Sequence, residues 1–199
     1  MKLIRHTSVL LLLMFLMPQA GADIVSLKLP GDIVASADYR AGDPDKPLVI
    51  FIHGFLQTRE FSTVQRLGTA MNESGYPILA PTLSLGISDR SQSVPCESIH
   101  LHSLESDSAE IERWVKWGQD KGYRDIVLVG HSAGSVNITS YLAGHVPPVV
   151  RKTILISLTY FGAGRPAGQE TEAHAITANK MLKESAEDIG EFALAYCKT

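Results

Sequence analysis

Four short runs of almost wholly apolar residues recur along the chain, with longer mixed segments between them. The runs are LVIFIH, YPILAP, DIVLVG and TILISL, at residues 48–53, 76–81, 125–130 and 153–158. Short runs rich in β-branched residues are typical of strands that are buried on both faces. Strands of this kind that alternate with helices form a mostly parallel sheet. The sequence therefore predicts an α/β fold, a doubly wound sheet with helices on both faces.

The segments around these runs predict the remaining elements. Helices are expected near residues 61–75, 107–118, 135–143 and 178–185. In the second of them, Asp107 and Glu110 are expected to cap the helix. Residues 24–29 and 33–39 alternate loosely around a Gly-Asp turn, which predicts an antiparallel hairpin at the edge of the sheet. A further strand is expected to begin near residues 192–196.

The N-terminus has the features of a secretory signal. Lys2 and Arg5 make it positive, residues 9–17 form an unbroken apolar run, and Ala-Gly-Ala at residues 20–22 suits signal-peptidase cleavage. We therefore expect residues 1–22 to be a cleaved signal peptide and the protein to be exported, to the periplasm or out of the cell. The alternative is an uncleaved N-terminal anchor, although the apolar run is short for a membrane span.

Length and charge limit what the rest of the chain can be. Residues 23–199 are long enough for one domain with a substantial core. The formal net charge of −3 becomes about −5 once the two cationic residues of the signal are removed. An acidic balance argues against a nucleic-acid partner, which would favour a basic surface. After signal cleavage, no segment is expected to form a stable membrane span.

The chain has two cysteines, Cys96 and Cys197. Exported proteins fold in an oxidising compartment, so a pair of cysteines favours one disulfide. Two unpaired thiols are the alternative, because the sequence does not show whether the two residues lie close together.

The pentapeptide Gly-His-Ser-Ala-Gly at residues 130–134 follows the third apolar run and precedes a predicted helix. A serine at such a turn is held in a strained conformation that exposes its hydroxyl oxygen. Gly130 and Gly134 lack Cβ atoms, so the turn can close and the helix can approach the sheet. The helix N-terminus offers unpaired amides. Ser132 is therefore a candidate nucleophile, and the amide of Ala133 is a candidate oxyanion donor.

A second oxyanion donor is expected from the turn after the first apolar run. This turn has the sequence His53-Gly54-Phe55, and its glycine lets the backbone fold back over Ser132. The Phe55 amide would complete an oxyanion hole with the Ala133 amide. Loss of one such donor typically costs about 3 kcal/mol of transition-state stabilisation.

Together, the segments FIHGF (residues 51–55) and LVGHSAG (residues 128–134) resemble the α/β-hydrolase superfamily, most closely its secreted or periplasmic esterase and lipase-like members. The two segments come in the family's order, and each lies on its expected element. The resemblance covers residues 24–199. It implies an α/β-hydrolase fold without its last strands and helices, hydrolysis of ester or related acyl bonds in small molecules, and no cofactor.

The family's catalytic triad is not complete in this chain. The resemblance implies that the acid and the histidine follow the serine, on strand ends that would lie beyond Thr199. After Ser132 the only histidines are His145 and His174, and neither matches the family's position. Three later acids also lack a family match: Glu170, Glu172 and Asp188. We therefore expect a C-terminal truncation, which would leave this chain without general-base activation of its serine and make its turnover poor or absent.

Other polar residues near the motifs have less specific roles. His131 and His53 are expected to be structural. His100 and His102 lie in a polar loop after the second apolar run and are candidates for contacting substrate. Together with Cys96 they suggest a zinc site, but C-x₃-H-x-H lacks a fourth ligand at the usual spacing, so no metal is expected.

The positions of three further side chains in the sequence suggest where they lie in the fold. Arg59, just after the oxyanion turn, is expected either to bind a substrate carboxylate or to lie on the surface. Trp114 and Trp117 are expected at the core and the rim of one helix.

The main functional hypothesis is therefore a serine hydrolase in which Ser132 attacks an acyl carbonyl and the Phe55 and Ala133 amides hold the oxyanion. One alternative is a catalytically inactive binding module that retains the serine turn. Another is an interaction protein in which Ser132 only caps a helix and an unpaired sheet edge recruits a partner strand.

Overall fold

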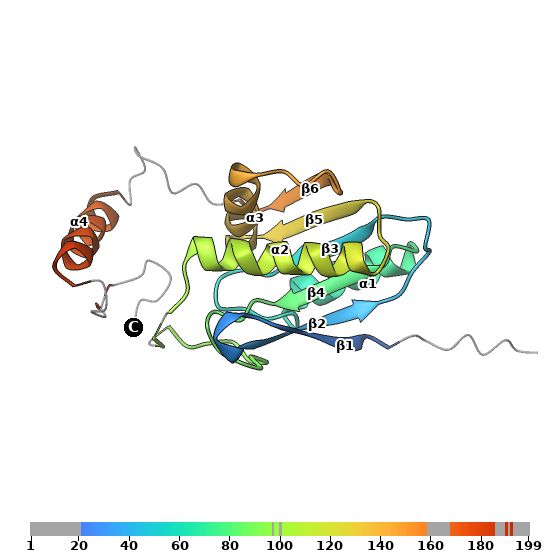
Figure 1. Cartoon of the computed structure of the whole chain (residues 1–199), viewed down its shortest axis with the longest axis horizontal. Coiled ribbons are helices and arrows are strands. Elements are labelled where there is room, and N and C mark those ends of the chain that lie inside the picture. Colours follow the sequence, from blue (N-terminus) through green and yellow to red (C-terminus); the bar gives the residue numbers. More distant parts are fainter. Residues whose placement is uncertain are drawn as a thin grey trace, which may run out of the picture.

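The apolar runs form the central strands of a sheet in the computed structural model, which describes residues 21–96, 98–99, 101–158, 168–185, 190 and 192. Six strands lie in the order β1-β2-β4-β3-β5-β6 (Figure 1). The strands are β1 (Asp23–Lys28), β2 (Val34–Arg40), β3 (Leu48–Ile52), β4 (Ile78–Thr82), β5 (Ile126–His131) and β6 (Val150–Ile156). The last four are mutually parallel. The predicted mostly parallel α/β sheet is confirmed.

The N-terminal hairpin lies at one edge of this sheet, as predicted. β1 and β2 pair antiparallel, from Asp23 opposite Tyr39 to Lys28 opposite Val34. A 3₁₀ turn at Pro30–Asp32 joins them. β2 also pairs antiparallel with β4, so the hairpin extends the parallel strands on one side. Residues 1–20 of the predicted signal peptide lie outside the described residues.

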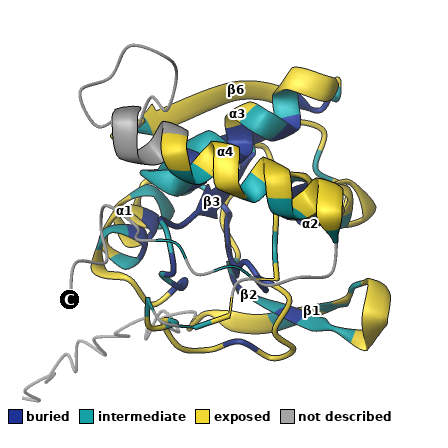
Figure 2. Cartoon of the chain, turned by 90° about the vertical axis from the view of Figure 1, so that its left-hand side faces the viewer, coloured by how far each residue is buried: buried dark blue, intermediate teal, exposed yellow. Residues whose placement is uncertain are grey.

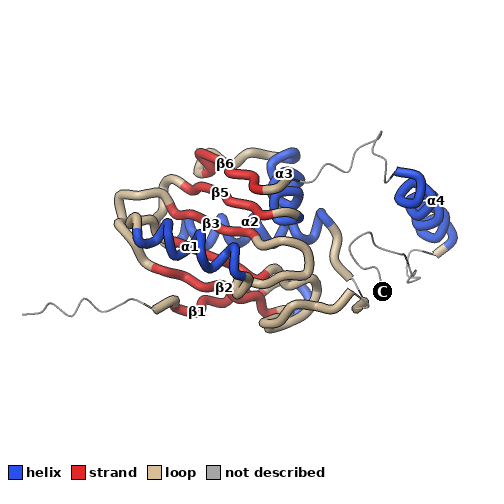
Figure 3. Tube along the Cα trace, turned by 180° about the vertical axis from the view of Figure 1, so that it is seen from behind, coloured by secondary structure: helices blue, strands red, loops and turns tan. Residues whose placement is uncertain are grey.

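Helices cover both faces of the sheet. α1 (Ser62–Glu73) packs on one face, and α2 (Leu104–Asp120) and α3 (Ala133–Gly144) pack side by side on the other (Figures 1 and 3). Side chains alternate along β3, so Val49 and Phe51 join the core under α1. Leu48, Ile50 and Ile52 join the larger core under α2 and α3. Burial on both faces explains why β3 contains no polar residue.

β6 differs from the expectation of a buried strand at residues 153–158. It spans Val150–Ile156 and is exposed over most of its length, in contrast to the buried β3 (Figure 2). Ile154 and Leu155 retain 43% and 38% exposure. β6 is the outermost strand on its side of the sheet, so it lacks the second neighbouring strand that β3 and β5 have among the described residues.

α4 (Gly168–Glu184) begins earlier than expected and covers neither face of the sheet (Figures 1 and 3). The strand expected near residues 192–196 lies outside the described residues except for Phe192, which is not in a strand. No helix in the described part of the chain has the length and apolar character needed to cross a membrane.

Candidate active site

Ser132 occupies a sharp turn between β5 and α3. Its backbone has φ 53° and ψ −120°, a combination that side chains with a Cβ atom rarely adopt. Its N–H donates to the Ile156 carbonyl oxygen at 2.9 Å, which ties the turn to β6. Although Ser132 is the residue that precedes α3, its hydroxyl makes no capping hydrogen bond to the helix. The side chain is therefore not used to stabilise the helix that it precedes.

Two glycines allow this turn to form. A Cβ at Gly130 would lie 2.7 Å from backbone atoms of Gly134 and Ser135. A Cβ at Gly134 would collide with the carbonyl oxygens of Ile52 and His53. The first contact is within the turn, whereas the second is between α3 and the end of β3. The predicted role of both glycines, closing the turn and admitting the helix, is confirmed by these contacts.

The register of β3 and β5 brings the second motif next to the serine turn. Ile52, the last residue of β3, pairs with Gly130, the first residue of the pentapeptide. The turn that follows β3 is tight. The Gly54 N–H donates to Gln57 Oε1 at 3.0 Å, and the Gln57 N–H donates to the Gly54 carbonyl at 3.2 Å. Phe55 is therefore held between two hydrogen-bonded residues.

His53 supports this turn as a neutral side chain. Its Nδ1 lies 2.8 Å from the Gly54 carbonyl oxygen, and its Nε2 lies 3.0 Å from the backbone N of Leu83. A proton on Nδ1 and a lone pair on Nε2 satisfy both contacts. Burial lowers the pKa of His53 to about 3, and the positive charge of Arg90 also lowers it. The expected structural role of His53 is thus supported by its contacts.

Arg90 is a structural residue of this region that the sequence did not indicate. Its guanidinium donates to the carbonyl oxygens of Leu83 and Gln57, each at 2.7 Å, and contacts His53 Nε2 at 3.2 Å. The loop after β4 and the oxyanion turn are therefore linked through one side chain. Burial lowers the pKa of Arg90 to about 10, while the charge of Glu110 opposes this shift. Arg90 remains a cation at neutral pH.

A cavity of about 370 Å³ lies beside the serine turn. The two predicted oxyanion donors, Phe55 and Ala133, both line it. Most of its remaining wall is apolar: Leu56, Leu83, Leu85, Leu104 and Val136. Ser132 is half-buried and directly precedes Ala133, but it is not itself a lining residue.

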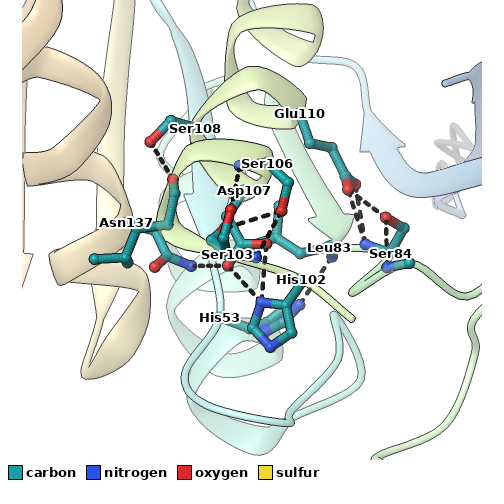
Figure 4. Close-up of polar contacts among 12 residues, drawn as sticks. His53, Leu83, Ser84, His102, Ser103, Ser106, Asp107, Ser108, Glu110 and Asn137 are labelled. Carbon is teal, nitrogen blue, oxygen red and sulfur yellow. Dashed lines mark hydrogen bonds and ion pairs between the residues drawn. The ribbon is translucent and has the colours of Figure 1, made fainter. Parts of the chain in front are cut away.

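One wall of the cavity carries a histidine–carboxylate pair (Figure 4). His102 Nδ1 lies 3.1 Å from each carboxylate oxygen of Asp107. Asn137 Nδ2 donates to Asp107 Oδ2 at 3.2 Å. His102 is therefore at the cavity, where substrate contact was expected, whereas His100 lies outside the described residues.

The expected capping roles of Asp107 and Glu110 are wrong. The residue before α2 is Ser103, which exchanges hydrogen bonds with Ser106 in a capping box. Both acids lie inside the helix and are buried, with 3% and 4% exposure. The helix therefore begins one turn earlier than expected, and both acids lie within it on the same face as the buried Ile111 and Trp114.

The carboxylate of Glu110 anchors the loop after β4. It accepts hydrogen bonds from the Ser84 hydroxyl at 2.6 Å and from the Ser84 N–H at 3.0 Å (Figure 4). Burial raises the pKa of Glu110, and the hydrogen bonds from Ser84 and Trp114 oppose this rise. Glu110 thus holds Ser84, and Arg90 holds the neighbouring Leu83. Two buried side chains therefore fix adjacent residues of this loop.

The other predicted residues lie away from the cavity. His131 stacks on Phe61 with ring centroids 6.1 Å apart, which supports its structural role. Arg59 is buried and pairs with Asp38 at 2.7 Å, so neither the surface nor the substrate-carboxylate expectation holds. His145 follows the last residue of α3.

The structure also shows where two tryptophans and one further histidine from the sequence analysis lie. Trp114 is fully buried, and Trp117 is partly buried at the edge of the same core, as expected. His174 lies on α4, where its ring contacts Phe192 at a centroid distance of 5.7 Å.

The predicted disulfide and the zinc site considered above each include one residue that lies outside the described ranges. Cys96 packs against the main core, but Cys197 lies outside the described residues, so the disulfide stays a prediction. Within the described ranges, no group of three or more His, Cys, Asp or Glu side chains could hold a metal ion. His100, the third member of the considered zinc set, is not among them.

Comparisons with known proteins agree with this architecture. Residues 37–158 match a family described as "Protein of unknown function (DUF1749)". No curated protein sequence matches the chain. The structure is similar to the α/β hydrolase GrgF from Penicillium sp. sh18, with 15% identity and a TM-score of 0.60 over 84% of this chain and 56% of that chain. It is also similar to α/β hydrolase domain-containing protein 10 from mouse, with 17% identity and a TM-score of 0.58 over 85% of this chain and 62% of that chain.

A cold-adapted esterase from an Arctic intertidal metagenomic library is similar too, with 16% identity, a TM-score of 0.54, and coverage of 67% of this chain and 59% of that chain. At these identities the similarity shows the fold. The chain spans between 56% and 62% of the length of the three proteins. The sheet order, the strained serine turn and the match over residues 37–158 lead to one conclusion: the chain belongs to the DUF1749 family and has the α/β-hydrolase fold.

Proposed function

We propose that the protein is a serine hydrolase that cleaves ester or related acyl bonds with Ser132 as the nucleophile. The observation that carries this proposal is the backbone of Ser132, which has φ 53° and whose hydroxyl makes no helix-capping bond. A serine that only capped α3 would accept a hydrogen bond from a helix amide through its side-chain oxygen, and its cap role would not require this strained backbone.

The two amides proposed for the oxyanion hole flank the same cavity. Ala133 is the first residue of α3, where helical amides have no acceptor within the helix. Phe55 lies in the turn that His53, Gln57 and Arg90 hold in place. Amides that are rigid before substrate binds stabilise a developing oxyanion without reorganisation at the moment of reaction.

The cavity wall supports an apolar acyl substrate. Five aliphatic side chains line the cavity beside the serine turn: Leu56, Leu83, Leu85, Leu104 and Val136. Neither Arg90 nor Arg59 lines the cavity, and both use their guanidinium groups in contacts within the protein. We therefore propose an uncharged acyl group as substrate, with no cofactor.

A fluorophosphonate probe tests the nucleophile directly, since it forms a covalent bond to an activated serine. We expect the wild-type protein to be labelled and Ser132→Ala not to be labelled. Ser140→Ala, on the same helix but outside the cavity wall, is the control and should label as wild type does. A folded wild-type protein that does not react would contradict the proposal and favour the non-catalytic binding module.

We also propose that residues 1–22 are removed on export and that Cys96 pairs with Cys197 in the oxidising compartment. The intact mass of the secreted or periplasmic protein measures both. It should correspond to a chain that begins at Asp23, and it should rise by about 2 Da on reduction. A mass that includes residues 1–22 would favour the anchor.

A further inference from the structure

We propose that Leu56 and Leu85 set the length of the acyl chain that the protein accepts, and that this length is short. The inference rests on the proposed function, because it names the residues that select the substrate at the same site. It starts from the backbone of the two leucines, which has a conformation that leucine rarely adopts.

Leu56 stands where its turn favours glycine or asparagine. The Gln57 N–H donates to the Gly54 carbonyl at 3.2 Å, so residues 54–57 form a β-turn in which Leu56 is the third residue. Its φ is 56°. A β-turn with a positive φ at its third residue usually carries glycine or asparagine there, because a larger side chain crowds the backbone.

Leu85 occupies a similar position in the loop after β4. The Ile87 N–H donates to the Ser84 carbonyl at 2.9 Å, so residues 84–87 form a second β-turn. Its two central residues, Leu85 and Gly86, have φ 53° and 80°. Two positive φ angles at the centre characterise a type I′ turn, in which asparagine, aspartate and glycine predominate. Gly86 suits its position, whereas Leu85 does not.

The two leucines are exceptional within the described part of the chain. The other non-glycine residues there with a positive φ are small and polar: Asp32, Asp89, Ser132 and Ser157. A left-handed backbone destabilises a residue that has a Cβ atom, and glycine at either leucine position would remove this strain. Such strain persists only where the surroundings require it, so we infer that both leucine side chains are needed where they lie.

Both strained leucines line the cavity beside the serine turn. Leu56 directly follows Phe55, whose amide is one of the proposed oxyanion donors, and Leu85 reaches the cavity from the loop after β4. Their exposure is 8% and 7%. An acyl chain whose carbonyl oxygen lies between the two proposed amides therefore extends into a cavity that these two side chains bound.

The loop that carries Leu85 separates this cavity from a second one. Leu83 and Leu85 line the first cavity, whereas Ser84 and Gly86 line a second cavity of about 240 Å³. Alternate residues of the loop thus face different cavities. The Ser84 hydroxyl donates to the buried Glu110 carboxylate at 2.6 Å, which fixes the loop as a wall between the two.

The volume of the first cavity agrees with a short acyl chain. It is about 370 Å³, near the lower end of the range of about 300–1,000 Å³ that is typical of small-molecule sites. Each methylene group that fits inside should raise the reaction rate about fourfold, because its burial removes apolar surface from water. A chain that already reaches the leucines gains nothing from additional carbons.

A series of alkyl fluorophosphonates with ethyl, butyl, octyl and dodecyl chains tests this limit, because the alkyl group takes the place of the acyl chain. We expect the labelling rate of the wild-type protein to rise from ethyl to butyl and to fall at dodecyl. Leu56→Ala and Leu85→Ala should each raise the ratio of the octyl rate to the ethyl rate by at least about tenfold, because further methylene groups fill the space of the lost side chain.

Leu79→Ala is the matched control for loosened packing. Leu79 is a fully buried leucine on β4 that belongs to the main core but does not line the cavity. Its truncation should destabilise the protein, as the truncation of a buried leucine generally does, yet keep the octyl-to-ethyl ratio within about twofold of wild type. A leucine that serves only the core would behave in the same way.

Glycine variants keep the inference testable where an alanine variant does not fold, as judged by circular dichroism. Leu85→Gly removes the same side chain but adopts the left-handed backbone without strain, and it should raise the octyl-to-ethyl ratio as Leu85→Ala does. Where both variants fold, Leu85→Gly should unfold at the higher temperature. The opposite order would contradict the strain from which the inference starts.

The outcomes are distinguishable. Wild-type protein that none of the probes labels contradicts the proposed function and removes this inference with it. Labelling that requires Ser132, together with a wild-type octyl-to-ethyl ratio in the leucine variants, leaves the hydrolase in place and overturns only the role of Leu56 and Leu85. An equal rise of this ratio in Leu79→Ala also overturns that role, because general loosening of the core would then explain the change.

Discussion

Arg90 contacts Nε2 of His53 across 3.2 Å while the same guanidinium donates to the Gln57 carbonyl at 2.7 Å. The cation therefore holds both the residue that begins the oxyanion turn and the residue that ends it. A buried arginine without a carboxylate partner at hydrogen-bonding distance among the described residues is unusual. Its donors are satisfied by backbone carbonyls instead, so the loop after β4 serves as a rigid support for the turn after β3.

Replacing Arg90 should loosen this support. In Arg90→Lys, one ammonium group cannot reach carbonyls on two separate loops, so buried acceptors lose their partner. We expect the free energy of unfolding to fall by about 3 kcal/mol, measured by urea denaturation, and fluorophosphonate labelling to slow. Arg66→Lys, at an exposed position on α1, should change the free energy of unfolding by less than about 0.5 kcal/mol. Equal effects at the two positions would contradict the role given to Arg90.

The approach of α3 to β3 depends on Gly134. In Gly134→Ala, the new Cβ would collide with the carbonyl oxygens of Ile52 and His53, which belong to the backbone and cannot rotate away. We expect a loss of about 3 kcal/mol in the free energy of unfolding, or failure to fold. Gly144→Ala is a matched control at the other end of the same helix, because no atom lies within 4 Å of its new Cβ. That variant should be as stable as wild type or more stable.

The strain at Ser132 can be measured separately from its chemistry. Ser132→Ala should keep the strain, since alanine also has a Cβ. Ser132→Gly should relieve it and unfold at a temperature about 2–4 °C higher than Ser132→Ala. The same two substitutions at Ser140, inside α3, should have the opposite order, because glycine in a helix is less stable than alanine by about 1 kcal/mol. Identical melting temperatures for Ser132→Ala and Ser132→Gly would show that the turn stores no strain.

His53 should make stability depend on pH below neutrality. The folded protein keeps this side chain neutral down to a pKa of about 3, whereas the unfolded chain takes up a proton near pH 6.5. In this window the unfolded state therefore binds more protons than the folded state. The contribution of His53 to the free energy of unfolding falls as the pH is lowered from 6.5 towards 3. The maximum slope for one proton is about 1.4 kcal/mol per pH unit.

The variant His53→Gln isolates this effect, because glutamine does not titrate. We expect the excess in free energy of unfolding of the wild type over the variant to shrink as the pH is lowered from 6.5 to 4. Glu110, whose raised pKa acts in the opposite direction, is present in both proteins and cancels in the difference. Denaturant unfolding at several pH values provides the comparison, and a constant difference across this range would refute a neutral, buried His53.

Local patterns predicted the central strands and the serine turn correctly. Burial on both faces requires an uninterrupted apolar run, and β3 shows this directly, since Val49 and Ile50 pack into opposite cores. The turn at Ser132 was predictable because Gly130 and Gly134 stand where a Cβ atom would collide with nearby backbone atoms. TILISL at residues 153–158 has the same apolar pattern, yet β6 is exposed. Whether such a strand is covered depends on its neighbours in the sheet and not on its own residues.

The polar side of the site could not be predicted in the same way. Arg90 lies in a loop without periodicity, and its acceptors are backbone carbonyls that carry no sequence signal. Asp107 and His102 are close in sequence, but their pairing depends on Ser103 being the cap residue of α2, which the sequence did not indicate. Several serines near the start of this acidic helix could cap it, and the position of the true cap decides whether Asp107 is a capping residue or a side chain within the helix.

The pairing of Ile52 with Gly130 has a consequence for how this chain can vary. The two motifs lie far apart in sequence, yet their separation is set by one hydrogen-bonded step between adjacent strands. Insertions at the loop containing Gly122, a glycine with open space around it, can lengthen the chain between them without moving either motif. A one-residue slip of β5 against β3 would instead pull the nucleophile away from its oxyanion donors while leaving every residue of both motifs intact.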